Sequence, residues 1–323
     1  MREEYDEPSA LENTSVKKKK NKKKQQKKRT IKKVIIIVVV LAVLVCAGFF
    51  GYRYYQNYKY QESLKQHEET FDSLRQEKNT DNDGKAVIEG TSPTHDFNSY
   101  WKQNKDIYAF VTVDGTGVDY PILQNEEDNY YLMRNLDGSE GYPGCIYTNR
   151  INSMQFDDYL TVIYGHNMKN KTMFGSLHNF DDEDFCKTHT EFTIETPEEL
   201  LTYRIFAVVN FTDDNITYYL DPKDPSSVST FVNSIKTESA GRQPDYIDDS
   251  VEISDSDHLV VLATCIGKEP DRRFLVVGKL TGQTIYSNPI QRYFNDDGEQ
   301  VFDGSGTPAE IPIMNLLGSG AAE

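Results

Sequence analysis

The sequence of 323 residues predicts a mainly β protein: an eight-stranded β-barrel with peripheral helices, preceded by one transmembrane helix and a membrane-proximal helix. Two observations predict this arrangement. One is an uncharged apolar run of nineteen residues close to the N-terminus, which has the length of a membrane span. The other is a series of eight short apolar runs beyond residue 100, separated by Gly, Pro, Asp and Asn, as is typical of strands in a closed or nearly closed barrel.

The apolar run covers residues 34–52 and, as a helix, is about 28 Å long, close to the thickness of a bilayer core. Twelve Lys and Arg lie between residues 17 and 33. The positive-inside rule therefore predicts a cytoplasmic N-terminus, with residues 53 onward outside the cell membrane. A cleaved signal peptide and a buried core helix are the alternatives. Because the run is long for a signal peptide and follows so many cations, we expect an uncleaved signal-anchor.

Charge is divided unevenly along the chain. Residues 1–33, the predicted basic cytoplasmic segment, contain 13 Lys and Arg against 5 Asp and Glu. The whole chain has a net charge of −16, so the part after residue 33 is strongly acidic. Because the basic segment adjoins the predicted span, we expect it to contact anionic membrane lipid. The acidic exterior argues against binding of nucleic acid.

Residues 53–96 are predicted to form a membrane-proximal helix and a linker. A stripe at helical spacing comprises Tyr60, Leu64, His67, Phe71 and Leu74. Asp, Asn, Gly, Ser and Thr dominate residues 80–94, as in a linker. The folded domain is expected over residues 97–292, and residues 293–323, rich in Gly, Asp and Ser, are predicted to be a flexible tail.

The strands of the domain are predicted at residues 107–113, 118–123, 145–147, 159–164, 191–194, 201–211, 259–264 and 274–280. Two helices accompany them. Residues 97–102 include the single tryptophan of the chain. Residues 226–240 carry apolar residues at helical spacing behind a start signal that contains proline, and this helix separates the sixth strand from the seventh.

A cysteine and an arginine flank the turn between the last two predicted strands. Cys265 ends one apolar run, and Arg273 precedes the next. If these strands pair as a hairpin, a nucleophilic thiol lies beside a permanent cation. His166 follows Gly165 at the end of an earlier apolar run. A thiol, an imidazole base and a cationic oxyanion donor would together catalyse acyl transfer, whereas a buried structural thiol and a loop histidine are the simpler alternatives.

The chain contains three further cysteines. Cys46 lies in the predicted span, and Cys145 and Cys186 lie in the exterior part with Cys265. The odd exterior count leaves at least one thiol unpaired within the chain, and pairing of Cys145 with Cys186 stays open. Neither has the strand-end setting of Cys265, so we expect both to be structural. No CxxC or HxxxH spacing occurs, and we expect no metal and no other cofactor.

Several motifs resemble those of the sortases, most closely the class B sortases. They are Tyr164-Gly165-His166-Asn167-Met168, Met173-Phe174-Gly175-Ser176-Leu177, Leu262-Ala263-Thr264-Cys265 and Arg273-Phe274-Leu275-Val276-Val277, with two earlier segments at 119–124 and 128–132. The resemblance covers residues 97 to 282, and the helix at 226–240 resembles the feature that marks class B. Ala263 stands where serine is common in class B sites, and the tail after Tyr293 is longer than usual for the family.

The resemblance implies a cysteine transpeptidase at the outer face of a Gram-positive cell membrane. The implied catalytic residues are Cys265, His166 and Arg273, and the implied substrate-binding residues are Asn129, Leu132 and Thr264. The enzyme would cleave the sorting signal of a surface protein, hold that protein as a Cys265 thioester, and transfer it to an amine of a peptidoglycan precursor or of another protein. The alternatives are a cysteine peptidase that only hydrolyses and a membrane-anchored surface module without activity.

Overall fold

The computed structural model describes residues 32–33, 38–66, 69–70, 92–212, 220–239, 241–242, 245–267 and 269–292. The chain divides into two units, residues 1–62 and 63–323, which are described separately below. The predicted tail at 293–323, most of the predicted linker, and His67, Phe71 and Leu74 of the predicted stripe lie outside the described residues.

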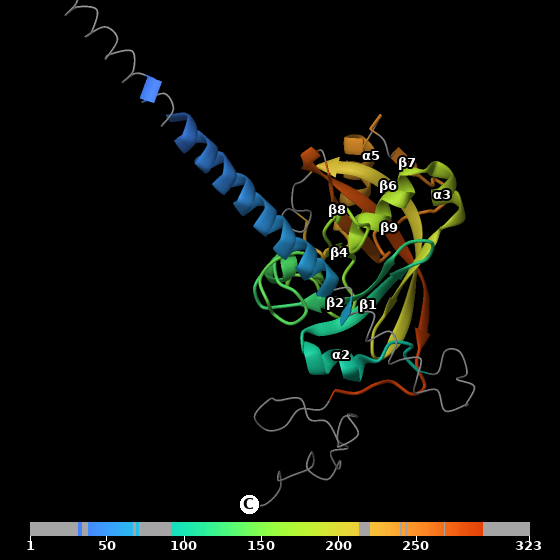
Figure 1. Ribbon diagram of the computed structural model, residues 1–323. Coiled ribbons are helices and arrows are strands. Elements are labelled where there is room, and N and C mark those ends of the chain that lie inside the picture. Colours follow the sequence, from blue (N-terminus) through green and yellow to red (C-terminus); the bar gives the residue numbers. More distant parts are fainter. Residues whose placement is uncertain are drawn as a thin grey trace, which may run out of the picture. The chain divides into compact units, whose positions relative to one another are not determined.

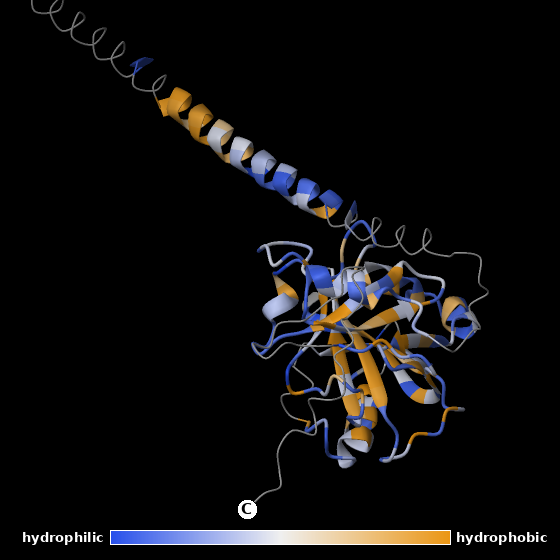
Figure 2. Ribbon diagram, turned by 90° about the horizontal axis from the view of Figure 1, so that it is seen from below, coloured by the Kyte–Doolittle hydropathy of each residue, from blue (hydrophilic) through white to orange (hydrophobic). Residues whose placement is uncertain are grey.

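One helix, Val38–Gln66, accounts for the described part of the first unit beyond residue 37 and continues past residue 62. Its 29 residues make it long and apolar enough, by length and composition, to cross a membrane. Figure 2 shows that the apolar residues fill its N-terminal half and that its C-terminal half is polar. Residues 38–52 of the predicted span and the start of the predicted membrane-proximal helix are therefore one continuous helix.

Eight strands of the second unit form a closed barrel (Figure 1). They are β1 (Ile107–Val113), β2 (Val118–Gln124), β3 (Ile146–Thr148), β4 (Leu160–Tyr164), β5 (Glu191–Glu195), β6 (Glu199–Thr212), β8 (Leu259–Ile266) and β9 (Glu269–Ile285). Their order is β5-β1-β2-β3-β4-β8-β9-β6, and pairing of β5 with β6 closes the ring. The eight-stranded barrel predicted from the apolar runs is thus confirmed.

A ninth strand, β7 (Asp245–Ile247), pairs with β6 beside the ring. The sequence did not predict it, because its three residues, Asp-Tyr-Ile, do not form an apolar run. Most neighbours in the barrel are antiparallel, but β2 pairs with β3 and β4 pairs with β8 in parallel. The C-terminal ends of β4 and β8 therefore lie at the same edge of the barrel. His166 follows the end of β4 there, and Cys265 is the second-last residue of β8.

The predicted helices are present, and they cover the barrel. α2 spans Phe97–Gln103 and begins at Asp96, whose carboxylate accepts a hydrogen bond from the Ser99 backbone N–H at 3.1 Å. α5 spans Ser226–Ser239, and its apolar stripe packs on β4, β6, β8 and β9 in one buried cluster. The members from α5 are Val228, Phe231 and Ile235. Two further elements, the 3-10 helix η2 (Phe174–Asp181) and α3 (Glu183–Thr188), connect β4 to β5.

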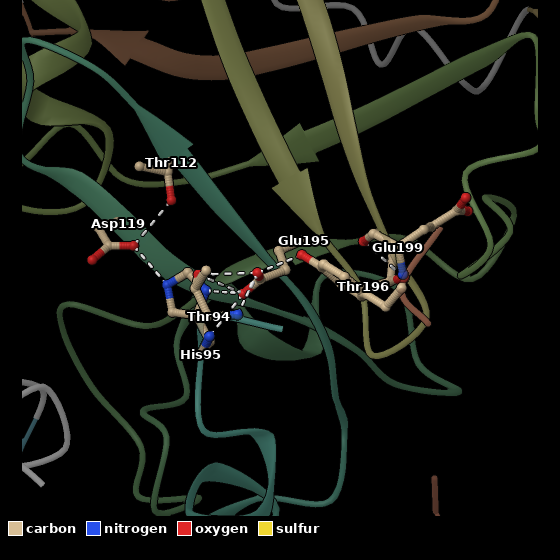
Figure 3. A network of polar contacts seen from close by, with 8 residues as sticks. Thr94, His95, Thr112, Asp119, Glu195, Thr196 and Glu199 are labelled. Atoms are coloured by element: carbon tan, nitrogen blue, oxygen red, sulfur yellow. Dashed lines mark hydrogen bonds and ion pairs between the residues drawn. The ribbon is translucent and has the colours of Figure 1, made fainter. Parts of the chain in front are cut away.

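A partly buried histidine, His95, joins the start of the domain to two strands (Figure 3). His95 Nδ1 forms an ion pair with Glu195 at the end of β5, and its Nε2 lies 3.0 Å from Asp119 in β2. Glu195 also accepts hydrogen bonds from the Thr94 backbone N–H at 2.6 Å and from the Tyr286 hydroxyl at 2.7 Å. This network fastens the segment before α2 to the barrel.

Candidate active site

Cys265 and Arg273 are direct partners in the antiparallel pair β8–β9. Side chains of directly opposed residues leave the same face of a sheet with Cβ atoms about 5 Å apart. The thiol and the guanidinium are therefore neighbours, and Cys265 is partly exposed. The predicted hairpin is confirmed, with a shorter turn than expected because β8 continues to Ile266 and β9 begins at Glu269.

Arg272 and Arg273 face opposite sides of β9. Arg272 opposes Thr212 of β6, whereas Arg273 lies between Phe211 of β6 and Cys265 of β8. Because side chains alternate along a strand, only Arg273 of the two shares a face with Cys265. One guanidinium nitrogen of Arg273, Nη1, donates to the carbonyl of Arg272 at 3.0 Å.

His166 follows β4 at a position level with Cys265 in the neighbouring strand β8. Tyr164 of β4 is the partner of Ala263 in β8, and the ladder continues with a hydrogen bond of 3.1 Å from the Gly165 N–H to the Ala263 carbonyl. His166 and Cys265 each lie two residues beyond that last pair, and so at the same end of the two parallel strands. The structure thus brings the three predicted catalytic residues to one edge of the barrel.

Gly165 permits the close approach of this loop to its neighbours. A Cβ at position 165 would lie 2.4 Å from Cδ1 of Ile146 and 2.7 Å from the ring of Phe174. Both contacts are too short for a real side chain. The residue before His166 must therefore be glycine if the loop is to leave β4 in this direction.

The proton on His166 can be placed on a definite nitrogen. Nε2 lies 2.7 Å from the carbonyl oxygen of Leu132, and a carbonyl oxygen only accepts hydrogen bonds. Nε2 therefore carries the proton, which leaves Nδ1 of the neutral ring as the basic nitrogen. Burial lowers the pKa of His166, and the Leu132 carbonyl offsets part of this effect, so the ring is neutral near neutral pH.

The three predicted substrate-binding residues lie around this edge in different settings. Thr264 is buried, and its hydroxyl donates to the Gly165 carbonyl at 2.7 Å. Asn129 has a left-handed backbone conformation, φ 60°, and precedes the 3-10 helix η1 (Tyr130–Leu132). Leu132 ends that helix with an exposed side chain. The carbonyl of Leu132 contacts the ring of His166 directly. The side chain of Asn129 is hydrogen-bonded to Tyr147, which lies beside the site.

Tyr147 belongs to the site and was missed by the sequence analysis. Its hydroxyl donates to Oδ1 of Asn129 at 3.0 Å, and its ring stacks on Tyr164 at 5.5 Å. Burial raises the pKa of Tyr147; negative charge on Tyr164 and Cys265 raises it further, and Arg273 opposes them. Tyr147 thus lies within electrostatic reach of Cys265 and Arg273, two of the three predicted catalytic residues. Its strand was predicted, but its neighbours depend on the pairing of β3 with β4.

Cys145 and Cys186 are buried, free thiols. Cys145 donates to the carbonyl of Arg134 at 3.3 Å, and Cys186 donates to the carbonyl of Phe180 at 3.2 Å. Burial raises the pKa of both, that of Cys186 to about 11. Both therefore stay protonated at neutral pH and lack the reactivity of a thiolate.

The family of the chain follows from its sequence. Residues 111–281, more than half of the chain, match the family model of the sortase domain. The chain belongs to the sortase family. Sortase B of Listeria monocytogenes is 33% identical to it over 183 residues, which are 55% of this chain and 71% of the relative.

Solved sortases share the barrel. The Staphylococcus aureus sortase B–substrate complex is 21% identical, with a TM-score of 0.54 over 68% of this chain and 97% of that one. A Streptococcus pyogenes class B sortase, described as involved in pilus biogenesis, is 31% identical, with a TM-score of 0.50 over 58% of this chain and 98% of that one. This sortase is accordingly a cysteine transpeptidase that is most similar to class B.

Proposed function

We propose that this sortase joins surface proteins to an amine through a thioester on Cys265. One observation carries the proposal: Cys265 and Arg273 face each other across β8 and β9, and His166 follows β4 at the adjoining strand end. A nucleophile, a fixed positive charge and a neutral base are thereby held on rigid strands at one edge of the barrel.

In the acylation half of this reaction, Nδ1 of His166 takes the proton of the Cys265 thiol, and the thiolate attacks the carbonyl carbon of the scissile peptide. Arg273 stabilises the negative charge that develops on the carbonyl oxygen. The imidazolium then protonates the leaving amine, the C–N bond breaks, and the thioester remains. Because the Leu132 carbonyl accepts from Nε2–H in both states of the ring, it also stabilises the imidazolium.

In the second half, an acceptor amine attacks the thioester. It loses a proton to His166, a new amide bond forms, and the thiol of Cys265 leaves. The proposed substrate is the C-terminal sorting signal of a surface protein, which Asn129, Leu132 and Thr264 would help to bind. The proposed acceptor is an amine of a peptidoglycan precursor or of another protein.

The membrane placement is also part of the proposal. The helix Val38–Gln66 supplies a stretch long enough to cross a bilayer, and the basic residues 1–33 would lie on the cytoplasmic side against anionic lipid. Residues 53–96 would then connect the span to the catalytic domain, residues 97–292, at the outer face of the cell membrane, with residues 293–323 as a tail.

Mass spectrometry of the full-length protein in detergent tests the function. The protein is mixed with a library of short peptides that carry Thr before the scissile bond, with and without hydroxylamine as a general amine acceptor. We expect a thioester on Cys265, and a peptide hydroxamate when hydroxylamine is present. Cys265→Ala should abolish both. Release of the free acid at the same rate in both arms would establish a hydrolysing peptidase, and cleavage by Cys265→Ala would overturn the site.

A further inference from the structure

We propose that Asn167 and His178 form a positioning pair, which holds Cys265 and His166 in register for the reaction. This proposal rests on the role of Cys265 as nucleophile. Neither side chain was singled out by the sequence analysis. Both contact the backbone of the strand end that carries the nucleophile, and neither is required by the steps of acyl transfer described above.

Asn167 joins the loop of His166 to the strand of Cys265. It follows His166 directly in sequence, and its Nδ2 lies 2.8 Å from the carbonyl oxygen of Cys265 and 3.0 Å from Nε2 of His178. An amide NH2 has two hydrogens, so it can donate to both at once. The backbone of Asn167 is itself held by a β-bridge to Met173.

His178 completes the arrangement through both of its ring nitrogens. Its Nδ1 lies 3.2 Å from a carboxylate oxygen of Asp181, which accepts a hydrogen bond, so Nδ1 carries the proton. Nε2 then accepts from Asn167. The Cys265 carbonyl lies 3.3 Å from Nε2, but both are acceptors in this state, so Asn167 makes the hydrogen bond to that carbonyl.

The same ring also supports the strand of Arg273. It packs on Phe274, with ring centroids 4.4 Å apart and an interplanar angle of 39°. Phe274 follows Arg273 directly, so its side chain leaves the opposite face of β9. His178 therefore lies on the side of the sheet away from the reactive thiol. It touches no reacting atom, and its role is to position the residues that do.

Regular strand pairing does not fix the backbone of β8 at the Cys265 carbonyl. The register of β8 against β9 is interrupted between Cys265 and Ile266, and the pairing of β4 with β8 ends at Tyr164 and Ala263. The Cys265 carbonyl thus lies beyond the last pair with β4, and a side chain takes the place of a backbone partner. Small displacements between nucleophile and base are costly, about 10²-fold for a shift of 1 Å.

Three substitutions test the proposal. Asn167→Ala and His178→Leu remove the hydrogen bonds, and both should lower kcat by roughly 10- to 100-fold with little change in KM. His178→Gln should stay within a few fold of the parent protein, because Oε1 of glutamine can accept from Asn167 in place of Nε2. A residue needed only for packing would not distinguish glutamine from leucine in this way.

His189→Gln is the matched control. His189 also stacks on a phenylalanine, Phe185, at 3.8 Å and lies 3.2 Å from a backbone carbonyl, but it has no contact with Cys265 among those that the described residues make. The kcat of the His189→Gln variant should equal that of the parent protein. All variants are assayed as full-length protein in detergent with the best peptide of the library, alongside thermal unfolding.

Three results would overturn the positioning pair: full kcat in Asn167→Ala, full kcat in His178→Leu, or equal loss in His178→Gln and His178→Leu. If His178→Leu fails to fold, Asn167→Ala, which changes a partly exposed side chain, decides the question. Failure of the proposed function is seen separately. An active Cys265→Ala variant would show that Cys265 is not the nucleophile, and the proposed function would fail. If Cys265→Ala is inactive but Asn167→Ala is fully active, only the positioning pair fails.

Discussion

The imidazole of His166 is held by the carbonyl of Leu132, with Nε2 and the oxygen 2.7 Å apart. These residues are 34 positions apart in sequence, and the contact determines which nitrogen acts as base. Nitrogen NMR of the resting protein should therefore show the Nε2–H form of His166, with Nδ1 as the nitrogen whose shift changes on titration. A resting Nδ1–H form would contradict the proton path proposed here.

Burial lowers the pKa of His166, so its imidazolium is a minor form of the resting protein near neutral pH. Because the proposed mechanism activates Cys265 by proton transfer to His166, the reactive thiolate–imidazolium pair should be a minor form as well. Alkylation of Cys265 by iodoacetamide should therefore keep rising between about pH 6 and 10. His166→Ala should change the shape of that profile. A plateau already reached by about pH 6 would reveal a preformed thiolate.

Replacing each arginine of the Arg272–Arg273 pair tests the register of β9. Arg273→Ala should lower kcat by roughly 10²- to 10³-fold, the usual effect of removing an oxyanion donor. Arg272→Ala should have a much smaller effect, because its side chain leaves the other face of the strand. The two variants are compared in steady-state assays with one peptide. A larger loss in Arg272→Ala would show that the register is shifted by one residue.

Short-range features of this fold could be predicted from sequence, because the residues concerned are close in the chain. The eight apolar runs indicated the barrel strands, and the hairpin that joins Cys265 to Arg273 involves residues only eight positions apart. Long-range contacts could not be predicted from local patterns, and the approach of His166 to Cys265 was expected only from the resemblance to the sortases. The neighbours of Tyr147 depend on the pairing of β3 with β4, and the contact of His178 with the Cys265 carbonyl spans 87 positions.

The buried thiols provide a separate test of the nucleophile. Cys145→Ala and Cys186→Ala should each leave turnover within a few fold of the parent, because neither thiol is accessible. Each should lower the free energy of unfolding by about 1 kcal/mol, as is usual when a small buried group is removed. Turnover and thermal unfolding of the two variants check both expectations. Loss of the thioester in either variant, with Cys265 intact, would contradict the assignment.

Protease treatment of intact protoplasts tests the proposed topology. The twelve Lys and Arg between residues 17 and 33 should keep the N-terminus inside, so external protease should remove the catalytic domain. An epitope placed at the N-terminus should survive unless the membrane is first dissolved in detergent. Protection of the catalytic domain, with cleavage of the N-terminal epitope, would reverse the orientation.

The ion pair of His95 and Glu195 should make stability depend on pH (Figure 3). Burial favours the neutral form of His95, but hydrogen bonds and negative charge from Asp119 and Glu195 outweigh it and raise the pKa of His95. A raised histidine pKa contributes stability that is complete below its unfolded value of about 6.5 and is lost as pH rises through the folded value. For Glu195, burial is outweighed by His95, Thr94 and Tyr286, which lower its pKa to about 2.

The Glu195 contribution is therefore present above its unfolded pKa of about 4.3 and is lost as pH falls toward about 2. Together the two groups stabilise the fold most between about pH 4.5 and 6.5. His95→Gln should cost about 2–4 kcal/mol in the free energy of unfolding at about pH 5.5, and less at about pH 8.5. Denaturant unfolding of the full-length protein in detergent measures this difference. His258→Gln is the control, because Nδ1 of His258 lies 2.8 Å from a backbone carbonyl, that of Asp158. An equal cost at both pH values would show that His95 is neutral in the folded protein and that its contribution is packing on Phe110.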